Sequence, residues 1–129
     1  DIDGILRGKY ITTDKFFSAL ENKTSFCNVI YGWDMNDACY DNTNYTGWHT
    51  GYPDSAAAID LNSFRRVPWE DNTPFFLGEL LNGEGEASEI CGRQLLKKIV
   101  SKSRSMGLDP ICSQEFEWFN FSETPQSIH

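Results

Sequence analysis

Two glutamates near the carboxyl end of the chain are the residues best suited to chemistry. Glu115 and Glu117 alternate with Phe116 and Trp118 in the run QEFEWFNF at residues 114–121. On a β-strand, alternate side chains share a face, so the two carboxylates would lie about 7 Å apart with the aromatic rings behind them. Such a pair suits a hard divalent cation or acid/base catalysis. An outer strand with a solvated acidic face has the same pattern, and spacing alone leaves both interpretations open.

A second acidic segment, Asp34-Met35-Asn36-Asp37, begins like a calcium-binding loop. The likeness fails because Cys39 stands where that loop requires glycine, and Tyr45 where it requires glutamate. The two histidines of the chain are too few for a histidine-rich metal centre. The sequence also lacks a CxxC zinc motif, a phosphate-binding glycine loop and a nucleophile elbow.

Periodicity predicts the elements that must position these residues. A helix is expected after an N-cap at Thr12–Asp14, and its apolar residues continue to about Asn22. The polar and aromatic segment 34–54 is too long for an ordinary connection and predicts a functional or interface loop. Strands are predicted at residues 1–11, 26–33, 56–67, 75–81 and 111–121.

The strongest helix signal begins at Ser88 and continues to about residue 106, before a glycine C-cap at Gly107. Its apolar stripe consists of Ile90, Leu95, Leu96, Ile99 and Val100. Its basic residues are Arg93, Lys97, Lys98 and Lys102. We expect the apolar stripe to face the core and the basic residues to form a solvated outer face.

Composition limits the possible partners. The 129 residues suffice for one domain, or one domain and part of another, and 40% are hydrophobic. Nineteen acidic and eleven basic residues give a net charge of −8, a poor surface for nucleic acid or an anionic membrane. No apolar run approaches the roughly 20 residues of a membrane span. We therefore expect neither nucleic acid nor membrane as a partner.

The four cysteines, Cys27, Cys39, Cys91 and Cys112, are scattered along the chain. Isolated cysteines beside apolar segments are typical of reduced thiols and favour a cytoplasmic protein. Three glycosylation triplets, which begin at Asn22, Asn44 and Asn120, keep a secreted domain with two disulfides open as an alternative.

Several segments, in the same order along the chain, resemble the glutamine synthetase family. The pieces are the opening segment 3–9, Pro53–Asp60, Arg66–Trp69, the strand at 75–81, Cys91–Arg93 and Gln114–Phe119. The last is similar to the family's Pro-Glu-x-Glu-Phe-Phe strand. Gly92 is a departure, because the family usually has Pro-Arg at the head of this helix. Each piece is weak alone, and their common order gives the resemblance its weight.

The resemblance implies an α+β chain that corresponds to the amino-terminal part of a longer enzyme. Residues 1–84 would form a β-grasp-like domain, mostly an antiparallel sheet with a helix, and residues 85–129 would begin the catalytic domain. Members of the family use ATP to phosphorylate the γ-carboxylate of glutamate, and ammonia or an amine then displaces phosphate. The chain by itself is expected to be inactive, since the resemblance implies that the family's remaining metal-binding glutamates, its nucleotide-binding segment and its glutamate-binding arginines lie beyond residue 129.

Site residues also follow from the resemblance. Glu115 and Glu117 would each coordinate Mg²⁺ or Mn²⁺, which neutralises phosphoryl oxygens. Asp34 would reach the ammonium site of a neighbouring subunit, although its Trp33-Asp34-Met35 context departs from the family pattern and a loop-capping role fits it equally. The full protein would form a ring-like homo-oligomer in the cytoplasm.

Three alternatives remain open. The acceptor could be a polyamine or another amine in place of ammonia. The chain could belong to a non-catalytic structural relative that kept the fold. It could also be an unrelated acidic module that binds calcium, or one that binds carbohydrate through the aromatic residues of segment 31–52.

Overall fold

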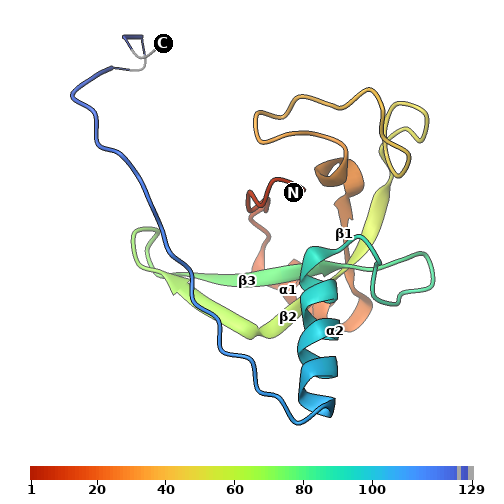
Figure 1. Ribbon diagram of the computed structural model, residues 1–129. Coiled ribbons are helices and arrows are strands. Elements are labelled where there is room, and N and C mark those ends of the chain that lie inside the picture. The colour runs from red at the N-terminus through yellow and green to blue at the C-terminus, as the bar shows by residue number, and fades with distance from the viewer. Residues whose placement is uncertain (125, 128–129) are drawn as a thin grey trace. The chain divides into compact units, whose positions relative to one another are not determined.

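The computed structural model describes residues 1–124, 126 and 127, and it is a mixed α+β structure (Figure 1). The elements in chain order are α1 (Thr13–Asn22), β1 (Thr24–Cys27), the 3₁₀ helix η1 (Asn28–Tyr31), β2 (Asp54–Val67), β3 (Thr73–Leu80) and α2 (Gly92–Ser105). The α+β fold class expected from the sequence is confirmed. The chain divides into two compact units, Asp1–Lys98 and Ile99–His129. The expected domain boundary between residues 84 and 85 stays a prediction.

Helix α1 begins where the sequence places its N-cap. Thr12 is extended, and its hydroxyl accepts a hydrogen bond from the backbone N–H of Lys15 at 3.3 Å. The helix ends at Asn22 and is followed by the C-cap residue Lys23, whose φ of 62° is positive. On the buried side of the helix, the Phe16 ring lies against the Phe76 ring of β3, with 4.9 Å between centroids. Capping and aromatic packing therefore fix this helix on the first unit.

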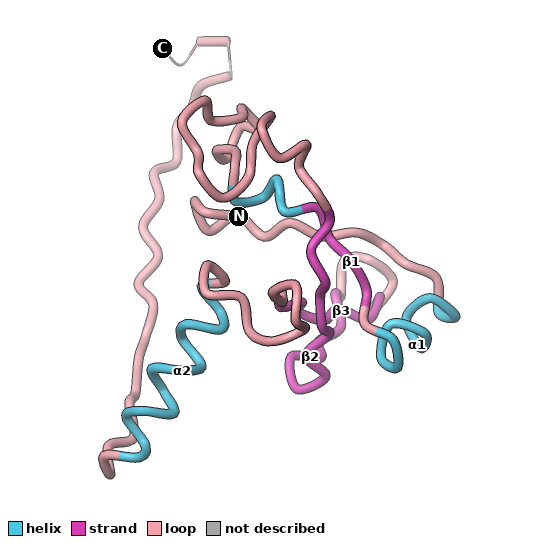
Figure 2. The backbone as a smooth tube through the Cα atoms, turned by 90° about the vertical axis from the view of Figure 1, so that its right-hand side faces the viewer, coloured by secondary structure: helices cyan, strands magenta, loops and turns pink. Residues whose placement is uncertain are grey.

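The three strands form one antiparallel sheet in the order β1-β2-β3 (Figure 2). The register of β2 against β3 shifts between Asp60 and Arg65. At this irregularity the Ser63 hydroxyl accepts a hydrogen bond from the backbone N–H of Leu77 at 2.7 Å and donates one to the Asp60 carbonyl. A side chain thus replaces a missing backbone partner, which is how a bulge keeps the long β2 strand paired on both sides of its bend.

The long segment between η1 and β2 packs through polar as well as aromatic groups. Thr46 is fully buried, and its hydroxyl donates to the Asn28 side-chain oxygen at 2.5 Å. The Tyr45 ring lies edge-on to Tyr31 at 6.0 Å. Gly32 is needed here because a Cβ would approach the Thr46 side chain to 2.9 Å. The segment is therefore an ordered loop whose interior is stabilised by hydrogen bonds.

Four expectations about the elements are wrong. Residues 1–11 and 111–121 form no strand, and residues 28–31 are a 3₁₀ helix within the strand expected at 26–33. A strand needs a neighbour for its backbone groups, and an alternating sequence does not supply one. Helix α2 also starts four residues after the expected Ser88, because residues 87–91 form turns and a bridge from Ala87 to Leu81. None of the helices in the described residues is both long and apolar enough to span a membrane.

Candidate metal and ligand sites

The two glutamates singled out from the sequence lie in the second unit on an extended and exposed segment. Glu115 and Glu117 are both exposed, and neither makes a hydrogen bond or ion pair within the described part of the chain. Phe116 and Trp118, expected to pack behind them, are 75% and 74% exposed. The strand that would put both carboxylates on one face is absent. Their role as metal ligands therefore stays a prediction, and the proposed metal strand is corrected to an unpaired segment.

Two carboxylates are too few ligands for a complete cation site. Across residues 1–124, 126 and 127, no group of three or more His, Cys, Asp or Glu side chains is arranged to hold a metal ion. Mg²⁺ prefers six oxygen ligands and Ca²⁺ six to eight, and water can supply only some of them without loss of affinity. The Glu115 and Glu117 oxygens are hard donors of the right type, but they form only part of such a set.

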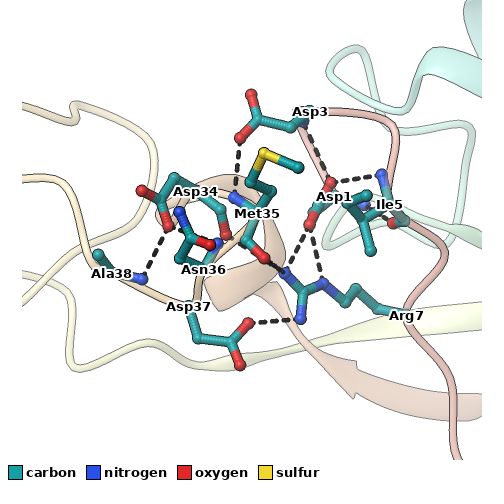
Figure 3. A network of polar contacts seen from close by, with 9 residues as sticks. All are labelled: Asp1, Asp3, Ile5, Arg7, Asp34, Met35, Asn36, Asp37 and Ala38. Atoms are coloured by element: carbon teal, nitrogen blue, oxygen red, sulfur yellow. Dashed lines mark hydrogen bonds and ion pairs between the residues drawn. The ribbon is translucent and has the colours of Figure 1, made fainter. Parts of the chain in front are cut away.

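Asp34 caps a tight loop. Its Oδ1 accepts hydrogen bonds from the backbone N–H groups of Asn36 at 2.8 Å and Ala38 at 2.9 Å (Figure 3). This is the local side-chain-to-backbone pattern typical of aspartate at a turn. The Oδ2 atom makes no hydrogen bond within the described residues. The loop-capping role is thus present, and one carboxylate oxygen remains available for the ammonium role, which stays a prediction.

Arg7 holds this turn against the start of the chain. Its Nε donates to Asp1 Oδ2 at 2.8 Å, its Nη1 pairs with the Asp37 carboxylate, and its Nη2 donates to the Asp34 carbonyl at 3.2 Å (Figure 3). The guanidinium also lies over the Trp33 ring, 4.9 Å from its centroid. Charge-assisted hydrogen bonds of this kind fix geometry well. The opening segment therefore positions the loop that carries Asp34.

A second pair of carboxylates, on the sheet, was not singled out from the sequence. Asp60 of β2 and Glu79 of β3 have side chains that are only 9% and 8% exposed. Arg93 of α2 donates from Nε to Glu79 at 2.8 Å and pairs with Asp60 through Nη2. Lys97 pairs with Glu79 and lies 3.4 Å from Asp60, and the Gln94 amide donates to Glu79 at 2.9 Å. We call Asp60, Glu79, Arg93 and Lys97 the α2 charge cluster.

The α2 charge cluster corrects the expected orientation of α2. Arg93 and Lys97 contact the sheet, whereas the apolar Leu95 and Leu96 are 54% and 61% exposed. The sequence expectation assumed that apolar side chains always face the sheet. Here buried carboxylates on the strands reverse that preference, because a buried charge requires an ionic or hydrogen-bonding partner.

In the α2 charge cluster, the pKa shifts of Asp60, Arg93 and Lys97 all favour the charged form of the side chain. The hydrogen bond from Arg93 holds the pKa of Asp60 below its usual value, although burial opposes the change. The hydrogen bond to Asp60 raises the pKa of Arg93, and the hydrogen bond to Glu79 raises the pKa of Lys97. Asp60 is therefore ionised, and Arg93 and Lys97 are protonated, near neutral pH.

Comparison with known proteins decides the family. No family model matches the chain. It is 48% identical over 128 residues to a type-1 glutamine synthetase 2 from Dictyostelium discoideum, which covers 99% of the chain. It is 34% identical to a glutamate–isopropylamine ligase from a Pseudomonas species, again over 99% of the chain, and 27% identical to a γ-glutamylethanolamide synthetase from Streptomyces coelicolor over 96%. The chain belongs to the glutamine synthetase family.

The chain is much shorter than the relatives that it matches. It spans about a quarter of the relatives named above, between 25% and 28% of their residues. The family resemblance seen in the sequence is confirmed. Two of its pieces, Pro53–Asp60 and Cys91–Arg93, meet in the structure through the Asp60–Arg93 ion pair. The order of the pieces in the sequence does not by itself indicate this contact.

Proposed function

We propose that the chain is part of an ATP-dependent ligase that joins ammonia to the γ-carboxylate of glutamate through γ-glutamyl phosphate. The observation that carries the proposal is the 48% identity to a type-1 glutamine synthetase along nearly the whole chain. The other relatives named above are also ligases or synthetases of γ-glutamyl amides, by their names. All of these relatives are thus named as ligases or synthetases, and their names differ in the amine that is joined to glutamate.

The metal ligands proposed in this chain are Glu115 and Glu117. Phosphoryl transfer from ATP places negative charge on oxygens that Mg²⁺ or Mn²⁺ neutralises when bound. Both carboxylates are exposed and have no competing ion pair within the described residues, so they are free to take a hard cation. The remaining ligands would come from outside this chain, because two carboxylates alone do not complete a coordination shell.

Asp34 is proposed to bind the ammonium or amine substrate in the active site of a neighbouring subunit. A carboxylate favours the charged ammonium form and orients it by hydrogen bonds. Support comes from the geometry of the turn, in which Oδ1 is held by two backbone N–H groups and Arg7 fixes the carbonyl of the same residue. The carboxylate is therefore held in one orientation. This proposal includes a homo-oligomer, ring-like in arrangement, and a cytoplasmic location.

A second candidate function is a γ-glutamyl–amine ligase for a larger acceptor. The specific observation that favours it is the 34% identity, over 99% of the chain, to a relative named for isopropylamine. Trp33 precedes Asp34, so an apolar indole lies next to the proposed amine-binding carboxylate in the sequence. An alkyl group on the amine would gain from such a neighbour, and ammonia would not.

Phosphate release from ATP tests both candidates. A longer protein that contains this chain is assayed with glutamate and, in turn, ammonia, isopropylamine, ethanolamine and a polyamine. The proposal expects glutamate-dependent phosphate release that is fastest with ammonia, and the 129-residue chain alone serves as the inactive control. A faster rate with an alkylamine would favour the second candidate. No release with any acceptor would contradict both and favour a non-catalytic relative.

A further inference from the structure

Helix α2 lacks the usual means of attachment to a sheet. An amphipathic helix normally buries an apolar face, and most of its stability in a protein comes from that burial. No residue of α2 is buried, and Leu95 and Leu96 are more than half exposed. Within the first unit, apolar contact between residues 92–98 of α2 and the sheet is therefore too small to hold the start of the helix in place.

Charged contacts take the place of the apolar face at the start of α2. Asp60 and Glu79 lie on adjacent strands, and the register pairs Ala58 with Glu79, so that the two acids share one face of the sheet. Arg93 and Lys97 are four residues apart, which puts both on the same side of the helix. Two cations thus meet two acids, and each cation contacts both.

The carboxylates of the α2 charge cluster depend on this contact. They are almost fully buried, whereas the Arg93 and Lys97 side chains are 33% and 49% exposed. A buried carboxylate without a cation or hydrogen-bond donor carries a large desolvation cost, so separation of α2 from the sheet would require water to replace the lost partners. The partly exposed cations leave a path by which solvent ions reach the pairs.

We propose that the α2 charge cluster is an electrostatic attachment that holds the first turns of α2 on the sheet and releases them at high ionic strength. The free energy of attachment comes from ion pairs that solvent reaches from the helix side. Dissolved ions compete with such solvent-accessible pairs. The Debye length, the distance over which dissolved ions screen a charge, falls from about 10 Å at 0.1 M salt to about 3 Å at 1 M. An apolar attachment would not weaken in this way, because it contains no ion pairs for NaCl to screen.

Cys91 reports on the attachment directly. It immediately precedes α2, is only 5% exposed, and its carbonyl accepts the first helical hydrogen bond, from Leu95 at 3.0 Å. Because its burial depends on the position of the start of α2, release of the helix should expose the thiol. The other three cysteines are replaced by serine, so that a neutral reagent such as iodoacetamide reports on this thiol alone.

The experiment follows the rate of thiol alkylation in NaCl from 0.05 to 1 M, normalised to the rate for a short cysteine peptide in the same buffer. We expect the normalised rate to rise about tenfold across this range. Hydrogen exchange at α1 amides is followed in the same samples. Since α1 is held by its cap and by the Phe16–Phe76 contact, its protection should not change. A normalised rate independent of salt would overturn the proposal, as would equal loss of protection in α1.

Two neighbouring lysines supply the matched variants. Lys97→Gln removes a cation of the α2 charge cluster, and Lys98→Gln removes the same charge from the next residue, which makes no ion pair within the described residues. At 0.05 M NaCl, Lys97→Gln should raise the alkylation rate several-fold and weaken its salt dependence, while Lys98→Gln should match the parent. Equal rates in the two variants would contradict the proposal. Far-UV circular dichroism checks that both are folded, and the salt series on the parent chain decides the question if either is not.

Discussion

Two pairs of carboxylates, Glu115 with Glu117 and Asp60 with Glu79, differ in almost every physical respect. Glu115 and Glu117 are exposed on a segment without strand partners. Asp60 and Glu79 are buried on adjacent strands, and cations of α2 neutralise both. The exposed pair can accept a ligand from outside, whereas the buried pair has its partners within the chain. Environment, rather than spacing, separates a candidate ligand site from a structural one.

The comparison also explains why the buried pair contributes to folding and the exposed pair does not. An exposed carboxylate keeps its water on folding, so its charge changes the free energy of unfolding little. A buried carboxylate exchanges water for specific partners, and those partners become essential to it. Each of the following predictions tests this difference, from the largest expected effect to the smallest.

Removal of Glu79 should give the largest loss of stability. Glu79→Ala takes away the shared acceptor of Arg93, Gln94 and Lys97. Because the two cations remain partly exposed and recover some hydration, we expect a loss of about 2 kcal/mol in the free energy of unfolding, less than for a fully buried pair. Chemical denaturation measures it. Glu115→Ala is the matched control and should change the value by less than about 0.5 kcal/mol; equal losses would remove the distinction between the pairs.

Acid should weaken the α2 charge cluster through protonation of Asp60. Arg93 holds the pKa of Asp60 below the usual 3.8, so this carboxylate adds stability above the unfolded pKa. That contribution is lost as the pH falls through the lower folded value. Stability should therefore decline below about pH 4 and decline less steeply in Asp60→Asn, as followed by thermal midpoints from pH 6 to 2. Identical slopes in the two proteins would show that Asp60 is not the linked group.

Divalent metal should have the smallest effect on this chain. Glu115 and Glu117 supply only part of a coordination shell, so Mn²⁺ should bind with a dissociation constant of about 1 mM or weaker. At 1 mM Mn²⁺ such binding stabilises the folded state by at most about 0.4 kcal/mol. Calorimetric titration and the thermal midpoint with and without Mn²⁺ measure both quantities. Micromolar binding that survives Glu115→Ala would locate the metal elsewhere.

Sequence predicts the elements whose signals are local. The cap at Thr12 and the apolar spacing predict α1 to within one residue, and the strands expected at 56–67 and 75–81 correspond to β2 and β3. Prediction from sequence fails where the structure of a segment depends on a partner that is distant in the sequence. The segment 111–121 has a strand-like pattern without a neighbour, and Arg93 faces the sheet because of Asp60, which precedes it by more than thirty residues. Buried charge on the strands was not visible from helix periodicity alone.

The metal requirement of a longer, active protein that contains this chain tests the central claim most directly. Phosphate release is measured against Mn²⁺ concentration for the parent, Glu115→Ala and Glu117→Ala, with Glu84→Ala, an exposed acid of the 82–85 turn, as the control. The account predicts that the half-saturating Mn²⁺ concentration rises at least about tenfold in Glu115→Ala and Glu117→Ala and stays unchanged in Glu84→Ala. An unchanged metal dependence in both Glu115→Ala and Glu117→Ala would contradict it.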